Sequence, residues 1–289
     1  MSSLTVALIQ LRTPASQAAA FAQVEPLVRK AAADGAEFIA TPEATNILER
    51  DRAKLFAALK SAETDPCVRG LIGLAAELKV WILIGSALVE REDGGAANRS
   101  ILVDPSGKVM ATYDKIHMFD VDLPTGERAR ESEVYTPGAE AVVARTPFAP
   151  VGLSVCYDIR FPYLYRALAK AGAEILAVPA AFTRPTGEAH WEVLLRARAI
   201  ETGAFVLAPA QGGRHQDGRG TWGRSMIIGP WGEVLAASEG DEPGVIAATL
   251  DLAASAKARA SIPSLANERV FSGPAPAGEP AFAAISAAS

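Results

Sequence analysis

Short apolar runs alternate along this chain with longer segments that carry alanine at helical spacing. The runs have the length of buried strands, and their side chains are almost all Ala, Val, Ile, Leu or Phe. They lie at residues 5–9, 37–40, 80–85, 152–155, 175–178 and 205–208. Two of the alanine-rich segments, 16–33 and 189–203, have helical length. Because strands and helices alternate, the pattern predicts an α/β fold.

The order of elements occurs twice. Residues 35–44 and 172–181 both begin Gly-Ala-Glu, continue through a strand and end in a Pro turn, while 101–109 and 226–234 are each two apolar runs around Pro-x-Gly. Such junctions are common, so one match alone would be weak, but two matches in the same order indicate a repeat. We expect two similar α/β halves, with their sheets face to face and helices outside, as one domain over 1–271.

Composition excludes several classes of protein. The chain has 289 residues, of which 49% are apolar, which is enough for a full core. It has two cysteines and no zinc-like Cys/His spacing, which argues against a disulfide scaffold and favours a reducing, cytoplasmic setting. The first apolar run ends at Gln10 without a preceding basic segment, so it predicts a strand rather than a signal peptide.

Charge and hydropathy narrow the choice further. No apolar run reaches the roughly 20 residues of a membrane span, and a net charge of −5 without a basic stripe offers no site for nucleic acid. We therefore expect small-molecule chemistry. Residues 272–289, rich in Pro, Ala and Gly, are expected to form a tail outside the domain.

Three polar residues follow predicted strands, at the edge where α/β folds gather their sites: Glu43, Lys115 and Cys156. A nucleophilic cysteine needs a base for its proton and a donor for the oxyanion on the attacked carbonyl, and these residues supply one of each. The repeat also singles out Glu43, because Ala180 occupies the matching position of the second half. A purely structural repeat would keep the two alike.

Each residue alone has a simpler explanation. A free cysteine is most often a small buried hydrophobic side chain, Glu43 could be an acid at a helix N-terminus, and Lys115 could be a solvated surface lysine. What favours a site is the Asp158 carboxylate and the Arg160 guanidinium directly after the cysteine. Charges there are costly unless they pair or face a pocket.

From Thr5 to about Phe271 the chain resembles the nitrilase superfamily of carbon–nitrogen hydrolases. The motifs that carry the resemblance are Thr-Pro-Glu at 41–43, Tyr-Asp-Lys-Ile-His at 113–117 and Cys-Tyr-Asp-Ile-Arg-Phe-Pro at 156–162. The resemblance implies a four-layer αββα sandwich without a metal or organic cofactor, and commonly a homodimer or larger homo-oligomer.

The resemblance also implies roles. Glu43 would be the general base, Lys115 the oxyanion-stabilising cation and Cys156 the nucleophile. Glu131 matches a second glutamate beside the lysine, with Glu133 as the alternative. The chain departs from many members at residue 41, where Thr replaces a larger side chain, so the shape of the pocket is left open.

Within the superfamily, three stretches resemble the Nit branch: 113–122, 156–162 and 189–215. The last of these is most similar to amidases of deaminated glutathione, the 2-oxo analogue of glutathione, which is cut to 2-oxoglutarate and Cys-Gly. The alternatives are ω-amidase acting on 2-oxoglutaramate, an N-carbamoyl-amine or aliphatic amidase, and a binding platform without activity. The intact Glu-Lys-Cys set disfavours the last.

Candidate substrate-binding residues are Tyr157, Arg160 and Phe182. The Tyr157 N–H would help to hold the tetrahedral adduct, and Arg160 would bind the carboxylate of the 2-oxo acid, because a guanidinium binds carboxylates in a bidentate manner. An ion pair of Arg160 with Asp158 or Glu192 is an equal alternative. We expect no chemical role for His190, and a glycine-rich loop at 211–220 that contacts the peptide-like part of a larger substrate.

Overall fold

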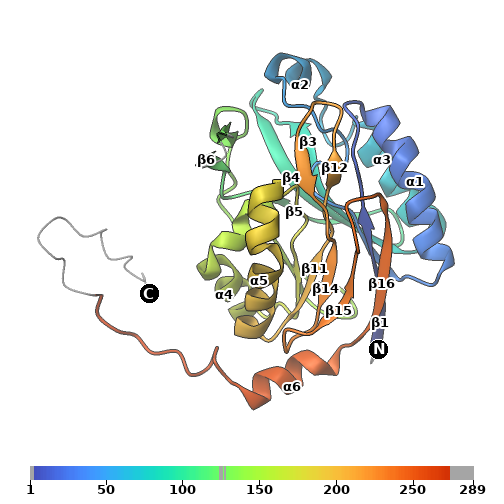
Figure 1. Ribbon diagram of the computed structural model, residues 1–289. Helices are drawn as coiled ribbons and strands as arrows, with labels where there is room; N and C mark the ends of the chain where they lie inside the picture. Colours follow the sequence, from blue (N-terminus) through green and yellow to red (C-terminus); the bar gives the residue numbers. More distant parts are fainter. Residues whose placement is uncertain (1–2, 124–125, 127, 274–289) are drawn as a thin grey trace, which may run out of the picture.

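The structure is a computed structural model that describes residues 3–123, 126 and 128–273 (Figure 1). Two six-stranded sheets form its centre. In spatial order, the first contains β16 (Gly244–Asp251), β1 (Ser3–Gln10), β2 (Phe38–Ala40), β3 (Trp81–Glu90), β4 (Ala96–Val103) and β5 (Val109–Asp114). The second contains β15 (Val234–Ala237), β14 (Met226–Ile228), β11 (Phe205–Ala208), β10 (Ile175–Ala177), β9 (Val151–Leu153) and β8 (Val143–Ala144).

The two sheets repeat one topology. Strands β1, β2 and β3 run parallel and continue into antiparallel β4 and β5. Strands β9, β10 and β11 also run parallel and continue into antiparallel β14 and β15. One further strand borders each set, β16 on β1 and β8 on β9. The prediction of two similar halves is confirmed.

Helices cover the outer face of each sheet. Helices α1 (Gln17–Ala33) and α3 (Pro66–Leu78) pack on the first sheet, and α4 (Pro162–Lys170) and α5 (Arg184–Thr202) pack on the second (Figure 1). Alternate side chains of strand β1 lie in two different core layers. Leu4, Val6 and Leu8 face the other sheet, whereas Ala7 and Ile9 face the helices. Because both faces are buried, the strand reads as a continuous apolar run. The αββα sandwich predicted from the sequence is confirmed.

Helix α5 begins five residues before the predicted start, at Arg184 rather than 189. The sequence from Arg184 to Glu188 contains both Pro185 and Gly187, which argue against a helix interior. Pro185, however, lies in the first turn, where its missing N–H costs no hydrogen bond. Gly187 is required by packing, because a Cβ there would overlap the side chain of Trp222.

Smaller elements surround the sheets. They are α2 (Arg52–Ala58), the hairpin of β6 (Asp120–Asp122) and β7 (Arg128–Arg130), the hairpin of β12 (Gly212–Arg214) and β13 (Gly220–Trp222), α6 (Ala253–Ser261), and short 3₁₀ turns at Glu131–Glu133 and Cys156–Arg160. From residue 274 onward the tail predicted at 272–289 lies outside the described residues. None of the helices in the described part of the chain is long and apolar enough to cross a membrane.

Gly85 lies where a strand of the first half packs tightly against the second half. A Cβ at this position in β3 would overlap the carbonyl oxygen of Thr41, in the first half, and the side chain of Pro179, in the second. Thr41 also accepts the Gly85 N–H through its hydroxyl at 3.1 Å. This explains the small side chain at residue 41: the hydroxyl bonds to the strand that passes over it.

We expect Gly85→Ala to lower the free energy of unfolding by about 1–3 kcal/mol, because backbone and proline ring cannot rotate away from an added methyl group. Thermal or urea unfolding measures the change. Gly73→Ala is the matched control, since nothing lies within 4 Å of a Cβ added to this exposed position of α3 and alanine favours helix. Equal stability of the two variants would contradict the close approach.

Candidate active site

The strands of both halves end at one cavity of about 770 Å³. Glu43 follows β2, Lys115 follows β5 and Cys156 follows β9. Six of the seven residues predicted for the site line the cavity: Glu43, Lys115, Glu131, Cys156, Tyr157 and Phe182. The fold thus gathers side chains that are far apart in the sequence, and the one that it leaves outside the lining is Arg160.

The Lys115 ammonium lies between two carboxylates. Its Nζ is 3.0 Å from Glu43 Oε1 and 2.7 Å from Glu131 Oε2, and the residue is only 2% exposed. Burial by itself lowers the pKa of Lys115, but the attraction of Glu131 and Glu43 outweighs burial and raises the pKa well above its ordinary value. The lysine is therefore a permanent cation. Glu133 is exposed on the same turn, so Glu131 is the second glutamate beside it.

Both oxygens of the Glu43 carboxylate are held in place. Oε1 accepts the Asn98 amide at 2.9 Å in addition to Lys115, and Oε2 accepts the backbone N–H of Ala181 at 2.8 Å. Ala181 comes from the second half of the fold, so both halves position one carboxylate. Glu43 is 6% exposed, and these donors stabilise its charge.

Cys156 sits at a sharp turn after β9. Its φ of +51° is in the left-handed region, which is uncommon for a residue with a side chain. The backbone N–H of Cys156 donates to the Pro179 carbonyl at 2.8 Å and holds the turn. Within the described residues the next N–H, that of Tyr157, has no acceptor. An oxyanion formed beside the sulfur could use this donor.

Asp158 connects the cysteine turn to the lysine segment. Its carboxylate is fully buried and accepts the Val155 N–H at 2.8 Å and the Tyr113 hydroxyl at 2.7 Å. The other oxygen accepts the His117 N–H at 3.1 Å and lies 2.7 Å from His117 Nδ1. Four contacts on one carboxylate therefore hold the cysteine turn against the lysine segment.

The electrostatics at the sulfur oppose spontaneous ionisation. Burial and the Glu43 carboxylate raise the pKa of the Cys156 thiol well above its ordinary value, while Lys115 lowers it. The thiol is therefore protonated near pH 7. A reaction at this sulfur requires transfer of its proton, and the Glu43 carboxylate that raises the pKa is also the adjacent acceptor.

Comparison with known proteins identifies the family. The family model described as carbon-nitrogen hydrolase matches residues 5–260. The chain belongs to the carbon–nitrogen hydrolase family. This carbon–nitrogen hydrolase is 41% identical over 251 residues to a protein of Yersinia enterocolitica named deaminated glutathione amidase, covering 86% of each chain. It is 42% identical to the human protein of that name, covering 86% of this chain and 76% of the other.

Solved structures agree. The NitFhit protein of C. elegans superimposes with a TM-score of 0.87 at 30% identity, over 93% of this chain and 66% of that one. Nit3 of Saccharomyces cerevisiae, a member of the nitrilase superfamily, superimposes with a TM-score of 0.81 at 25% identity, over 91% and 95%. This carbon–nitrogen hydrolase is thus an amidase of the nitrilase superfamily, which hydrolyses carbon–nitrogen bonds other than peptide bonds.

The ion pairs considered for Arg160 are wrong. Its two terminal nitrogens lie 3.3 Å from His190 Nδ1, whereas Asp158 is used by other partners and Glu192 pairs with Arg196. The Arg160 guanidinium also stacks 5.4 Å from the ring of Phe182 and 6.0 Å from that of Tyr157.

Asn98 is the residue that sequence reasoning missed. Its side-chain Nδ2 donates to Glu43 Oε1 and lies 3.4 Å from Glu131 Oε1. Its backbone carbonyl accepts the backbone N–H of Lys115 at 2.9 Å. Asn98 is 2% exposed within apolar β4. A buried amide in a strand is costly without polar partners, and that was the available signal.

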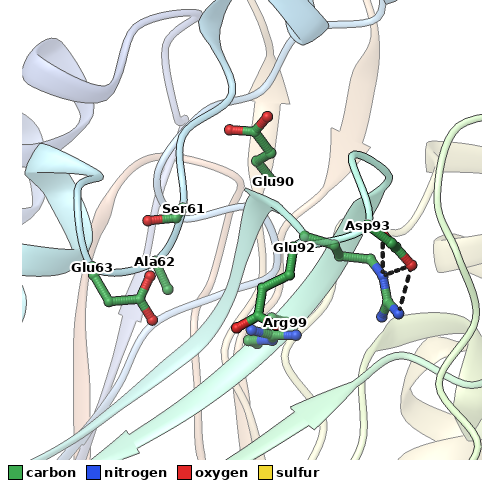
Figure 2. A pocket seen from close by; sticks show the side chains of 8 residues that line it. Ser61, Ala62, Glu63, Glu90, Glu92, Asp93 and Arg99 are labelled. Carbon is green, nitrogen blue, oxygen red and sulfur yellow. Dashed lines mark hydrogen bonds and ion pairs between the residues drawn. The ribbon is translucent and has the colours of Figure 1, made fainter.

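A second cavity, of about 580 Å³, lies apart from these residues at the turn between β3 and β4 (Figure 2). Its lining consists of Ser61, Ala62 and six charged residues, namely Glu63, Glu90, Arg91, Glu92, Asp93 and Arg99, and contains neither cysteine nor lysine. Within the described residues, no group of three or more His, Cys, Asp or Glu side chains is placed to hold a metal ion. The cavity lined by Glu43, Lys115 and Cys156 is therefore the candidate active site.

Glu43→Gln should lower the pKa of the Cys156 thiol, because it removes the carboxylate that raises this pKa and leaves the Lys115 ammonium that lowers it. The ultraviolet absorbance of the thiolate against pH measures the shift, with Cys156→Ala subtracted to remove the signal of Cys67. A midpoint equal to or above that of the unsubstituted protein would contradict the geometry.

Asn98→Asp should reduce kcat about 10–100-fold, because a carboxylate replaces the amide that donates to Glu43 and adds a third negative charge beside Lys115. Steady-state kinetics should show the loss in kcat rather than KM, and the acid limb of the rate profile should move to higher pH. An unchanged pH profile would mean that Asn98 serves packing alone.

Proposed function

We propose that this amidase hydrolyses deaminated glutathione to 2-oxoglutarate and Cys-Gly. The observation that carries the proposal is the identity of 41–42%, over 86% of the chain, to bacterial and human amidases that bear this substrate in their names. The cavity supports it in two respects. Its volume is within the range of small-molecule sites, and residues 218–220 of the predicted glycine-rich loop form part of its wall.

In the proposed mechanism Glu43 removes the thiol proton as Cys156 Sγ attacks the amide carbonyl. The carbonyl oxygen becomes an oxyanion that the Lys115 ammonium and the Tyr157 N–H stabilise. Glu43 then gives the proton to the leaving nitrogen, the C–N bond breaks, and a thioester remains on Cys156. Water deprotonated by Glu43 attacks the thioester, the C–S bond breaks, and the thiolate recovers the proton.

Glu131 is proposed to act through the lysine. Its two oxygens lie 2.7 and 2.9 Å from Lys115 Nζ, and one of them also accepts the Phe119 N–H at 2.6 Å. Two contacts orient the ammonium more firmly than one. Without Glu131, the lysine would be free to fold toward Glu43 alone and neutralise the base.

Arg160 is proposed to bind the carboxylate of the 2-oxo acid, with Phe182 and Tyr157 flanking the same subsite. The support is its stacking on these two cavity-lining rings. Its contact with His190 requires a neutral imidazole that accepts at Nδ1, and this acceptor holds the guanidinium beside the rings.

The alternatives make different demands on the cavity. An ω-amidase would use the same carboxylate subsite with ammonia as the leaving group, whereas N-carbamoyl-amine or aliphatic amidases need no 2-oxo acid recognition. The homodimer or larger homo-oligomer and the cytoplasmic setting expected from the sequence stay predictions.

The test is release of 2-oxoglutarate from deaminated glutathione and from 2-oxoglutaramate, measured side by side. We expect a higher kcat/KM for deaminated glutathione, and a loss of at least about 10⁴-fold in Cys156→Ala, because the nucleophile is removed with little change in volume. Cys67→Ala is the matched control: it replaces the other buried cysteine, in α3, and should keep activity. Hydrolysis of simple amides but of neither 2-oxo acid amide would overturn the proposed substrate.

A further inference from the structure

The cavity wall is strongly cationic in an acidic protein. The chain carries a net charge of −5. Among the described residues, however, the charged side chains that line the cavity outside the cluster of Glu43, Lys115 and Glu131 are five arginines and one glutamate. They are Arg50, Arg52, Arg128, Arg130, Arg219 and Glu49. Such a lining favours an anionic ligand and raises its local concentration.

Two aspartates pair with three of these arginines. Asp122 pairs with Arg128 and Arg130, and Asp217 pairs with Arg219. Neither aspartate is among the residues that line the cavity, whereas all three arginines are.

Arg219 is held by a single buried carboxylate. Its Nε donates to Asp217 Oδ2 at 2.6 Å, and its backbone N–H donates to Asp217 Oδ1 at 3.0 Å. The Asp217 side chain has no exposed surface, whereas that of Arg219 is 34% exposed. In the described part of the chain no acceptor contacts the two terminal nitrogens of Arg219. These are the pair of donors that binds a carboxylate in a bidentate manner.

The hairpin that carries Arg219 is fixed to the cavity. Strands β12 and β13 pair in an antiparallel hairpin, with Gly212 opposite Trp222 and Arg214 opposite Gly220. The Trp222 N–H donates to the Phe182 carbonyl at 2.9 Å. Thr221 Oγ1 lies 2.7 Å from Nε2 of the buried His215. Arg219 is therefore held near Phe182 by a rigid element rather than by a free loop.

Tyr135 lines the same cavity as Arg219 and Glu131. Burial raises the pKa of Tyr135 above its ordinary value, Glu131 raises it further, and Arg219 lowers it. The cavity wall therefore includes this tyrosine together with the lysine's carboxylate partner and the arginine. A substrate that reaches Cys156 can extend past this tyrosine to the arginine within the same cavity.

We propose that Arg219, oriented by Asp217, forms a second anionic subsite that binds the carboxylate at the far end of the leaving amine. The inference rests on the proposed function and deepens it: the enzyme selects amides whose leaving group is a short peptide with a free C-terminus. An amide that releases ammonia has no group for this subsite. Binding energy from this remote carboxylate then favours reaction of the larger substrate.

The experiment compares the unsubstituted enzyme with Arg219→Gln on deaminated glutathione, on the same compound with its glycine carboxylate converted to an amide, and on 2-oxoglutaramate. Arg219→Gln should lower kcat/KM for deaminated glutathione about 10–100-fold, mainly through KM. It should leave kcat/KM for 2-oxoglutaramate within about 2-fold, because that substrate never reaches Arg219. The amidated compound should be a poor substrate for both enzymes, with no difference between them.

Arg214→Gln is the matched control, since Arg214 is an exposed arginine of the same hairpin that does not line the cavity, and it should leave all three rates unchanged. An equal loss on deaminated glutathione and 2-oxoglutaramate in Arg219→Gln, or no loss on either, would overturn the subsite while leaving the proposed function in place. Failure of the unsubstituted enzyme to hydrolyse any of the three compounds would overturn both.

Discussion

A lysine ammonium with almost no contact with water is the constraint around which this molecule is organised. An isolated buried charge of this kind is costly, so it must be surrounded by compensating groups before the chain can fold stably. Lys115 has carboxylate oxygens of Glu43 and Glu131 within 3.0 Å, and Asn98 bonds the Glu43 carboxylate in turn. Since these residues come from separate segments, the cluster also determines how those segments meet.

The remaining site geometry serves to hold that cluster beside a strained cysteine. The left-handed backbone of Cys156 is kept by its bond to Pro179 and by the carboxylate of Asp158, which also bonds the segment that carries Lys115. One buried acid therefore positions both the Cys156 turn and the segment that carries Lys115. Donors that the fold holds in place before the reaction are the condition for effective electrostatic stabilisation.

Much of this arrangement could be predicted from the sequence. The strands buried on both faces read as apolar runs, the repeat indicated paired halves, and the residue types at the strand ends indicated the chemistry. What could not be predicted depends on contacts between distant segments. The glycine at 187 inside α5 is explained by Trp222 packing against it, and the partner of Arg160 is His190 of the same helix. Asn98 reads as one polar residue in a strand until the fold brings Glu43 to it.

The two Pro turns of the repeat have diverged into complementary tasks. In the first half the residue after Pro42 is Glu43, which supplies a carboxylate; in the second half the equivalent turn after Pro179 keeps alanine and supplies the backbone N–H of Ala181 to that same carboxylate. If the repeat arose by duplication, its two copies now supply different groups to one site instead of forming a site each. Each half is then incomplete by itself. In an ancestor made of two identical halves, each turn would have had to supply both the carboxylate and the backbone N–H that binds it.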